Sequence, residues 1–442
     1  MKNVDLTKGH ILKVVMALAL PIIGTSLLQF TYNLVDMFWV GKLGSDALAS
    51  VGSSSLFVNA GYAINALVVI GTGIRAAHAM GKKDKQEAKQ YINAGLIINC
   101  VLGVVYGSIL LVFGRSFIGF LNLKSAAIEK DAYIYLITYV PVLFFSFFNM
   151  LYIRILSSFG NNKISFVISL IGTVLNIVLD PLFIYTLGMG VFGAAVATLI
   201  ASVVMFILFN IVFKDVLRYS KQEKLDYHKI KDIIKLGSPM AAQRLLFSVI
   251  GIILAKIVAE FGSDAIAAQK IGLQIESITY MVIGGLNGAI ASFVGQNYGA
   301  KKFERIHKGY KSALAVGIGY SFVMAIFFLG IPQILAGVFV DDYNTITIAA
   351  SYLRVVGIVQ IFSTVEMISN GTFTGLGLPK IPAFISILFT SARIPFALVF
   401  TRFWGVDGVW ISIAFSSLLK GCISFLVYYF IVRKEHKSAG YI

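Results

Sequence analysis

The sequence predicts an all-α polytopic membrane protein with twelve transmembrane helices in two six-helix lobes. Of its 442 residues, 58% are hydrophobic and only 13% are charged, and the mean hydropathy is +0.84. A soluble chain would carry about 25% charged residues. Uncharged runs such as 47–74, 90–114 and 181–213 are each long enough to cross a hydrocarbon core of about 30 Å as a helix. The third observation is an internal repeat.

The repeat relates the first half of the chain to the second. Pro21 and Pro239 are 218 residues apart, and the same offset relates Gly44-Ser45-Asp46 to Gly262-Ser263-Asp264. Each half then holds six spans, so the two lobes have the same orientation and are related by a pseudo-twofold axis along the membrane normal. Parallel repeats of this kind are typical of transporters, with the substrate path between the halves. The alternative is an old duplication in a channel or a membrane enzyme.

The apolar runs and their polar breaks predict the elements in order. The N-terminal lobe covers 1–213, a connecting loop covers 214–231, and the C-terminal lobe covers 232–442. We expect helices at 14–40, 47–79, 90–113, 131–157, 163–186, 190–213, 232–260, 265–298, 309–331, 345–375, 380–402 and 406–432.

The net charge of +16 comes from basic residues in the loops and does not indicate nucleic-acid binding. Basic residues concentrate at the N-terminus, in the loops 80–90, 214–235 and 299–311, and at Arg433, Lys434 and Lys437. The positive-inside rule therefore places both termini and the connecting loop in the cytoplasm. We expect a multi-pass protein of the cell inner (plasma) membrane. The two cysteines, Cys100 and Cys422, both fall in predicted spans and form no metal-binding or disulfide pattern.

The first predicted helix contains a single carboxylate. Asp36 is the only charged residue between Val14 and Val40. A carboxylate facing lipid costs on the order of 2.5–3.5 kcal/mol, so Asp36 is expected to face protein or a water-filled cavity, as functional intramembrane acids do. The side chains on its face of the helix are candidates for the substrate cavity: Gln29, Tyr32 and Asn33. The alternative is that Asp36 caps the helix or bonds a neighbour structurally.

A second group of polar residues is expected at the same depth. Asn176 and Asp180 are four residues apart on one helical face, and Thr198 lies on the next helix. At about 1.5 Å per residue, these residues and Asp36 lie about 8–12 Å inside the outer helix ends. Such oxygen ligands suit a hard cation such as Na⁺. Alternatively, two repelling carboxylates allow one of them to carry a proton, or the cluster is structural.

The second half lacks this cluster at the repeat-related positions. Asp36, Asn176, Asp180 and Thr198 correspond to Leu254, Arg393, Ala397 and Ile413. Glu276 and Arg393 are instead candidates for the cavity, with Glu276 either lining it or pairing with Lys256 or Arg393. Glu366 lies deeper and is a possible secondary acidic site.

The quoted residues resemble a known family. Pro21–Tyr32, Val35-Asp36 and Val40–Gly44 are similar to helix 1 of the multidrug and toxic compound extrusion (MATE) family, and Ala265–Gly299 resembles its helix 8. The resemblance covers essentially the whole chain and implies export of organic, often cationic, compounds in exchange for Na⁺ or H⁺. Carried over by residue, the family's cation site in the N-terminal lobe is Asp36, Asn176, Asp180 and Thr198. A glutamate that one branch uses on helix 7 is absent from Ala241–Val249.

We therefore expect a secondary active efflux transporter that works by alternating access. It should act as a monomer in the bilayer on small organic substrates, with Na⁺ or H⁺ as coupling ion and no cofactor. The P-loop, HExxH and GxSxG motifs are absent, so no enzymatic activity is expected. One alternative is a lipid-linked precursor flippase of related fold, for which Lys256 and Arg393 are a modest indication. The other is a membrane enzyme or receptor without transport.

Overall fold

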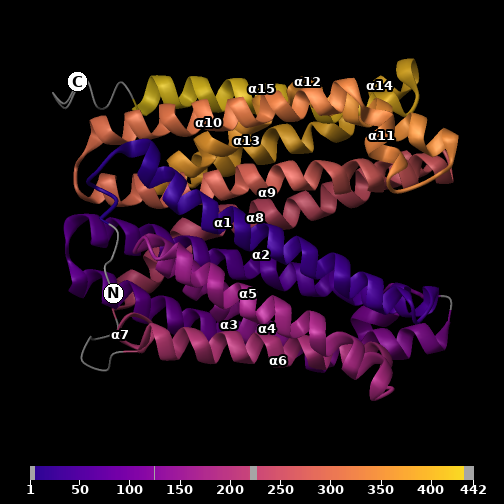
Figure 1. Ribbon diagram of the computed structural model, residues 1–442, viewed down its shortest axis with the longest axis horizontal. Coiled ribbons are helices and arrows are strands. Elements are labelled where there is room, and N and C mark those ends of the chain that lie inside the picture. Colours follow the sequence, from indigo (N-terminus) through magenta and orange to yellow (C-terminus); the bar gives the residue numbers. More distant parts are fainter. Residues whose placement is uncertain (1–4, 124, 220–225, 433–442) are drawn as a thin grey trace. The chain divides into compact units, whose positions relative to one another are not determined.

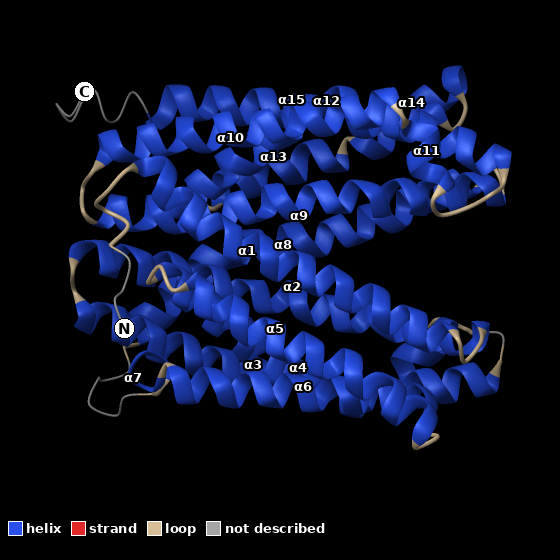
Figure 2. Cartoon of the chain, viewed as in Figure 1, coloured by secondary structure: helices blue, strands red, loops and turns tan. Residues whose placement is uncertain are grey.

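The computed structural model describes residues 5–123, 125–219 and 226–432, and these residues form helices without any strand (Figure 2). Part of the predicted connecting loop, residues 220–225, and the basic residues Arg433, Lys434 and Lys437 lie outside the described residues. The chain folds as two compact units. Unit 1 contains Gly24–Ala241, and unit 2 contains Leu6–Ile23 and Ala242–Ile442.

Unit 1 is built from the first half of the chain (Figure 1). Helix α1 (Ile11–Gly41) begins in unit 2 and enters unit 1 at Gly24, and α8 (Tyr227–Ala259) leaves unit 1 after Ala241. Between them come α2 (Ser45–Lys82), α3 (Lys85–Phe120), α4 (Ala126–Ser158), α5 (Asn162–Pro181), the π-helix η1 (Leu182–Thr186), α6 (Gly190–Val212) and α7 (Lys214–Leu217).

Unit 2 repeats the order of the long helices, with one of them split in two. Besides the first part of α1 and the second part of α8, its elements are α9 (Ser263–Gly299), α10 (Phe303–Gly330), α11 (Pro332–Gly337), α12 (Tyr343–Gly375), α13 (Lys380–Ser391), α14 (Arg393–Trp404), α15 (Asp407–Val427) and the π-helix η2 (Tyr428–Val432).

The helices of the two units pack in the same pattern. In unit 1, α4 packs on α2, α3 and α6, and α5 packs on α6. In unit 2, α12 packs on α9, α10 and α15, and α14 packs on α15. These are the pairs that the repeat relates, so both halves of the sequence form the same arrangement.

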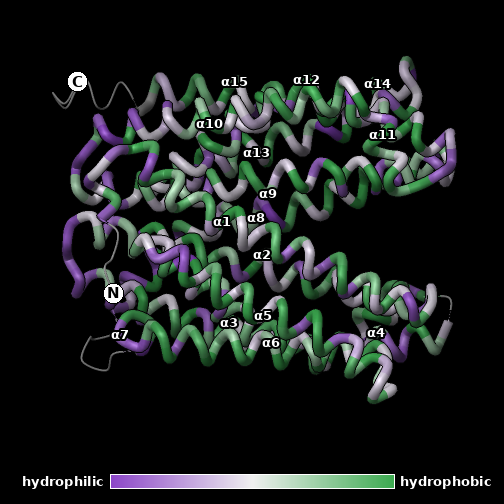
Figure 3. Tube along the Cα trace, in the orientation of Figure 1, coloured by the Kyte–Doolittle hydropathy of each residue, from purple (hydrophilic) through white to green (hydrophobic). Residues whose placement is uncertain are grey.

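Twelve helices of the described chain are long and apolar enough to cross a membrane, which confirms the predicted fold class. In Figure 3 the turn between α2 and α3 is hydrophilic, whereas α3 beyond it is largely hydrophobic. The predicted span 380–402 is interrupted at Ala392, between α13 and α14. Pro395 explains the interruption, because it has no amide hydrogen to donate to the Ser391 carbonyl.

The compact units differ from the predicted lobes at two segments. Leu6–Ile23 belongs to unit 2, and the first part of α8, up to Ala241, belongs to unit 1. The change of unit follows Pro21 in α1 and its repeat partner Pro239 in α8, each after two further residues. Both helices nevertheless continue through the proline.

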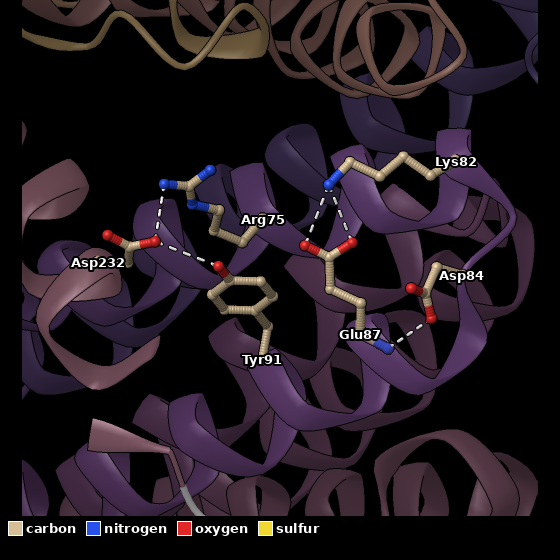
Figure 4. Close-up of polar contacts among 6 residues, drawn as sticks. All are labelled: Arg75, Lys82, Asp84, Glu87, Tyr91 and Asp232. Atoms are coloured by element: carbon tan, nitrogen blue, oxygen red, sulfur yellow. Dashed lines mark hydrogen bonds and ion pairs between the residues drawn. The ribbon is translucent and has the colours of Figure 1, made fainter. Parts of the chain in front are cut away.

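Close packing and one ion pair hold the first part of α8 in unit 1. A Cβ at Gly237 would lie 1.8 Å from the Leu67 carbonyl oxygen, so the two backbones touch because glycine has no side chain. Asp232 accepts from Arg75 at 2.8 Å and from the Tyr91 hydroxyl at 3.2 Å (Figure 4). This segment is therefore attached to α2 and α3.

The start of α3 is fixed by its own cap. Asp84 accepts the backbone amide of Glu87 at 2.8 Å, and the Glu87 carboxylate pairs with Lys82 at 3.0 Å (Figure 4). An N-cap carboxylate satisfies one of the amides that a helix start leaves without a partner.

Candidate functional site

Unit 1 contains a cavity of about 650 Å³ bounded by α1, α2, α4, α5 and α6. From α1, the predicted cavity residues Gln29, Tyr32 and Asn33 line it together with Asp36. Asn176 and Thr198 line the same cavity from α5 and α6. The structure thus brings together side chains that the sequence places up to 169 positions apart, from Gln29 to Thr198.

Hydrogen bonds connect three of the predicted ligands and join them to α1. The Asn176 side-chain amide donates to Asp180 Oδ1 at 3.2 Å and to Thr198 Oγ1 at 3.3 Å. The Tyr32 hydroxyl, one turn before Asp36, lies 3.1 Å from Thr198 Oγ1. Asp36 and Asp180 are also close enough to interact electrostatically. The four predicted ligands therefore form one cluster.

Three oxygen atoms of this cluster are buried without a hydrogen-bond partner among the described residues. They are Asp36 Oδ1, Asn176 Oδ1 and Asp180 Oδ2. Asp180 is 0% exposed and Asn176 is 1% exposed. A buried acceptor without a partner costs about 1–3 kcal/mol, and more when it is charged. The amide oxygen always accepts, and the two carboxylate oxygens can only accept while they are ionised. A bound cation would satisfy all three atoms, whereas a proton would satisfy a carboxylate.

A change of helix type positions Asp180. It is the last residue before Pro181, and the α-helix α5 gives way to the π-helix η1 directly after that proline. Pro181 cannot donate a backbone hydrogen bond, which makes this point of the helix easy to rewind. The Tyr185 hydroxyl of η1 then donates to the Trp39 carbonyl oxygen of α1 at 2.5 Å. The segment after Asp180 is thus joined to the helix that carries Asp36.

The donor set fits a hard monovalent cation. Two carboxylates, one carboxamide oxygen and one hydroxyl are oxygen ligands of the kind that hard cations prefer. The described residues contain no group of three His, Cys, Asp or Glu side chains that could hold a metal ion. Asp36, Asn176, Asp180 and Thr198 would hold Na⁺ through their oxygens, or one of the two carboxylates would carry a proton.

Aromatic side chains of this cavity were not predicted from the sequence. Tyr62, Tyr135 and Tyr139 line it together with Tyr32, and the rings of Tyr135 and Tyr139 stack with centroids 5.3 Å apart. The spacing of four positions from Tyr135 to Tyr139 is the available signal, because it puts both rings on one face of a span. The faces of tyrosine rings attract cations, so this wall of the cavity suits a positively charged ligand.

The repeat-related positions of unit 2 also meet, but as apolar core. Leu254, Ala397 and Ile413 belong to one hydrophobic cluster and are 4%, 0% and 9% exposed. These are the counterparts of Asp36, Asp180 and Thr198. The same backbone arrangement therefore supports a polar cluster in one unit and a hydrophobic core in the other. From the sequence we expected only that the second half lacks the polar cluster.

The other predicted residues of unit 2 lie in hydrogen-bonded surroundings. Glu276 is 5% exposed and accepts from the Tyr352 hydroxyl at 2.5 Å. Arg393 donates to the Ser416 and Ser417 hydroxyls at 2.8 Å and 3.2 Å. Neither Lys256 nor Arg393 forms an ion pair with Glu276 in the described part of the chain. Glu276 and Arg393 belong to unit 2, so they are not part of the cavity of unit 1.

Glu366 has a partner that the sequence did not reveal. Lys420 of α15 pairs with Glu366 Oε2 at 2.9 Å, and both side chains are less than 10% exposed, at 7% and 8%. The Ser386 hydroxyl donates to the other carboxylate oxygen at 2.9 Å. A lysine ammonium thus occupies the position beside Glu366 that a coupling cation would need.

The fold and the site define a class: a twelve-span membrane protein of two repeated units, with an oxygen-lined cavity in the first. Comparison with known proteins agrees with this class. The profile of the MatE family matches residues 21–182 and again 239–399. The two matches begin at Pro21 and Pro239, the pair from which the repeat was recognised, and together cover more than half of the chain. The chain therefore belongs to the MATE family of multidrug efflux transporters.

Individual relatives extend over nearly the whole length. The multidrug export protein MepA of Staphylococcus aureus (strain MSSA476) is 24% identical over 434 residues, which are 96% of this chain and 94% of MepA. Two crystal structures, described as MATE in the straight and in the bent conformation, each superpose with a TM-score of 0.93. The straight structure is 27% identical and covers 99% of both chains; the bent one is 26% identical and covers 100% of this chain and 99% of its own.

Proposed function

We propose that this protein exports organic cations across the membrane in exchange for Na⁺ or H⁺, with the coupling ion bound by Asp36, Asn176, Asp180 and Thr198. The observation that carries the proposal is the set of three buried acceptor oxygens without partners beside the cavity of unit 1. An inward ion flux can drive export only if ion and substrate bias the same conformational equilibrium, each through different affinity for its states.

The cavity supports a cationic substrate. Its four tyrosine rings and the Asp36 carboxylate supply the two attractions that bind a lipophilic cation, which are ring faces and a buried negative charge. A volume of about 650 Å³ is in the range of small-molecule binding sites. Since Asp36 borders the cavity and belongs to the ion cluster, ion and substrate compete for the same carboxylate.

We further propose alternating access through bending of α1. This helix changes from unit 2 to unit 1 between Ile23 and Gly24, close to Pro21, where its hydrogen bonding is weakest. Ion binding or protonation at Asp36 and Asp180 bends α1, reshapes the cavity beside Gln29 and Asn33, and releases substrate outward. The description of two structural relatives as bent and straight supports a fold with more than one conformation.

The proposed location is the inner (plasma) membrane. The proposed cytoplasmic position of both termini rests on the distribution of Lys and Arg among the loops. Neither the lipid-flippase alternative nor the reading without transport has support among the relatives, which include the multidrug export protein MepA.

Transport assays in vesicles test the proposal directly. Inverted membrane vesicles containing the wild-type protein should accumulate a fluorescent lipophilic cation when a Na⁺ gradient or a pH gradient is imposed separately, and the effective gradient identifies the ion. Asp36→Asn should abolish this accumulation at equal membrane amounts. Asp46→Asn is the matched control, because Asp46 is an exposed carboxylate of the same unit outside the cavity.

Two results would contradict the proposal. Gradient-driven accumulation by Asp36→Asn at the wild-type rate would remove the ion cluster from the mechanism. If neither gradient changes the accumulation by the wild-type protein, transport is not coupled to Na⁺ or H⁺.

A further inference from the structure

An open groove of about 500 Å³ lies in unit 2, where the start of α1 meets the first turns of α10. Its walls include His10, Ile11 and Leu12 on one side and Arg305, Lys308 and Lys311 on the other. Both α1 and α10 are membrane-spanning helices, and the groove lies at their first residues. The groove is therefore at the end of the hydrocarbon region, where lipid headgroups lie. It is separate from the ion cluster, which belongs to unit 1.

The segment 6–9, which leads into the α1 wall of the groove, is held in place by a set of hydrogen bonds. Arg305 donates to the carbonyl oxygens of Lys8 and Gly9 at 2.6 Å and 2.8 Å, and Lys302 donates to the Thr7 carbonyl oxygen at 2.7 Å. The Leu6 amide donates in turn to the side chain of Gln296 at 3.2 Å. The segment before α1 is thus attached to the end of α9 and the start of α10. Contacts within the protein therefore hold this side of the groove in place.

The groove combines positive charge with apolar surface. Arg305, Lys308 and Lys311 follow one another at three-residue intervals, which puts them along one side of α10. Lys308 pairs with Glu304 at 2.6 Å, but both side chains are largely exposed, at 62% and 71%, so this pair leaves the ammonium open to another anion. In Figure 3 the hydrophilic turn between α9 and α10 gives way to the hydrophobic α10.

We propose that this groove binds the headgroup of an anionic phospholipid. The lysines contact the phosphate, and an acyl chain lies against Ile11 and Leu12. Basic pockets between transmembrane helices at the membrane surface recognise such headgroups by this combination of charge and apolar contact. A soluble phosphate compound would use the charges but not the apolar residues, so the apolar wall favours the lipid. Bound lipid would stabilise the start of α1 against α9 and α10.

Native mass spectrometry of the purified full-length protein tests this inference. The protein is mixed with phosphatidylglycerol or with phosphatidylcholine, and the lipid retained per molecule is counted. The wild-type protein should retain phosphatidylglycerol in preference. Because each lysine near an anionic surface contributes about 1 kcal/mol, or roughly fivefold, the double variant Lys308→Ala/Lys311→Ala should weaken this retention roughly 25-fold.

Matched variants separate a site from general surface charge. Lys231→Ala/Lys235→Ala removes two exposed lysines near the start of α8 and should keep the preference. Lys308→Arg/Lys311→Arg retains both positive charges and should also keep the preference for phosphatidylglycerol. This variant still tests the proposal if the alanine variant fails to fold. Equal retention of both lipids by the wild-type protein, or an unchanged preference in the alanine variant, would overturn the proposal. So would displacement of the lipid by an equal concentration of glycerol 3-phosphate.

Discussion

Asn176 donates its side-chain amide to Asp180 Oδ1 at 3.2 Å from one turn earlier on the same helix, while Asp180 Oδ2 is buried without a partner among the described residues. Asp180→Asn keeps the shape and the accepting oxygen but removes the charge. We expect folding to be retained and gradient-driven export to fall to the level of cells without the protein. Substrate-resistance assays at equal membrane amounts measure this. Export by Asp180→Asn at the wild-type level would show that the charge has no role.

The buried pair of Glu366 and Lys420 is expected to matter for stability. Glu366→Gln can still accept from Ser386 but leaves the Lys420 ammonium buried and unpaired. Removing one partner of a buried pair costs about 3–5 kcal/mol, whereas replacing both by apolar or neutral groups is often neutral. Denaturant unfolding in detergent should therefore show a large loss for Glu366→Gln and a much smaller loss for Glu366→Gln/Lys420→Met. Equal losses for the two variants would rule out the ion pair as the cause.

Two glycines of α8 should respond in opposite ways to alanine. A Cβ at Gly237 would lie 1.8 Å from the Leu67 carbonyl oxygen, whereas a Cβ at Gly251 would have no atom within 4 Å. Gly237→Ala must push the first part of α8 away from α2 and lower the melting temperature. Gly251→Ala should leave it unchanged or raise it, since alanine is favoured over glycine in helices by about 0.8–1.0 kcal/mol. A thermal shift assay on both variants checks this, and similar melting temperatures would contradict the packing.

The sequence predicted those parts of the site that depend on local pattern. Asp36 is recognisable because its apolar run contains no other charge, and Asn176 and Asp180 because helical spacing puts them on one face. The pairing of Lys420 with Glu366 was not predictable in this way, because it joins α15 to α12 and depends on how two distant helices pack. The change of unit after Ile23 was likewise not predicted, because α1 continues through Pro21 as one helix and the unit on which each part packs depends on distant helices.

Asp342 gives a pH-dependent contribution at the start of α12. Its carboxylate accepts the Thr345 backbone amide at 2.8 Å, and this bond lowers the pKa of Asp342 below its usual value. Because the folded-state pKa is the lower one, the stabilisation is fully present above the unfolded value of about 3.9 and disappears as the pH falls through the folded value. Asp342→Ala should therefore lower the melting temperature at pH 5–7 and have less effect as the pH drops below about 4.

The neighbouring acid provides the control for this prediction. Asp341→Ala removes an adjacent exposed carboxylate that is not the N-cap of α12, so it should have little effect at any pH. Melting temperatures of the three proteins are compared at each pH. A deficit for Asp342→Ala that stays constant from pH 7 to pH 3 would show that the charge of the cap is not what stabilises the helix.

The last prediction concerns which ends of the helices face the cytoplasm. Lys301 lies in the turn before α10, and Asp342 directly precedes α12. One span, α10, and the short α11 separate them, so the two positions lie on opposite sides of the membrane. The excess of Lys and Arg on the side of Lys301 predicts that this side is cytoplasmic, together with Lys82 and the 214–231 connection.

Single-cysteine labelling in a background without Cys100 and Cys422 checks the orientation. An impermeant maleimide added to intact cells should label Asp342→Cys but not Lys301→Cys, and permeabilised cells should show both. Labelling of Lys301→Cys alone in intact cells would reverse the predicted orientation, and with it the direction assigned to the ion gradient.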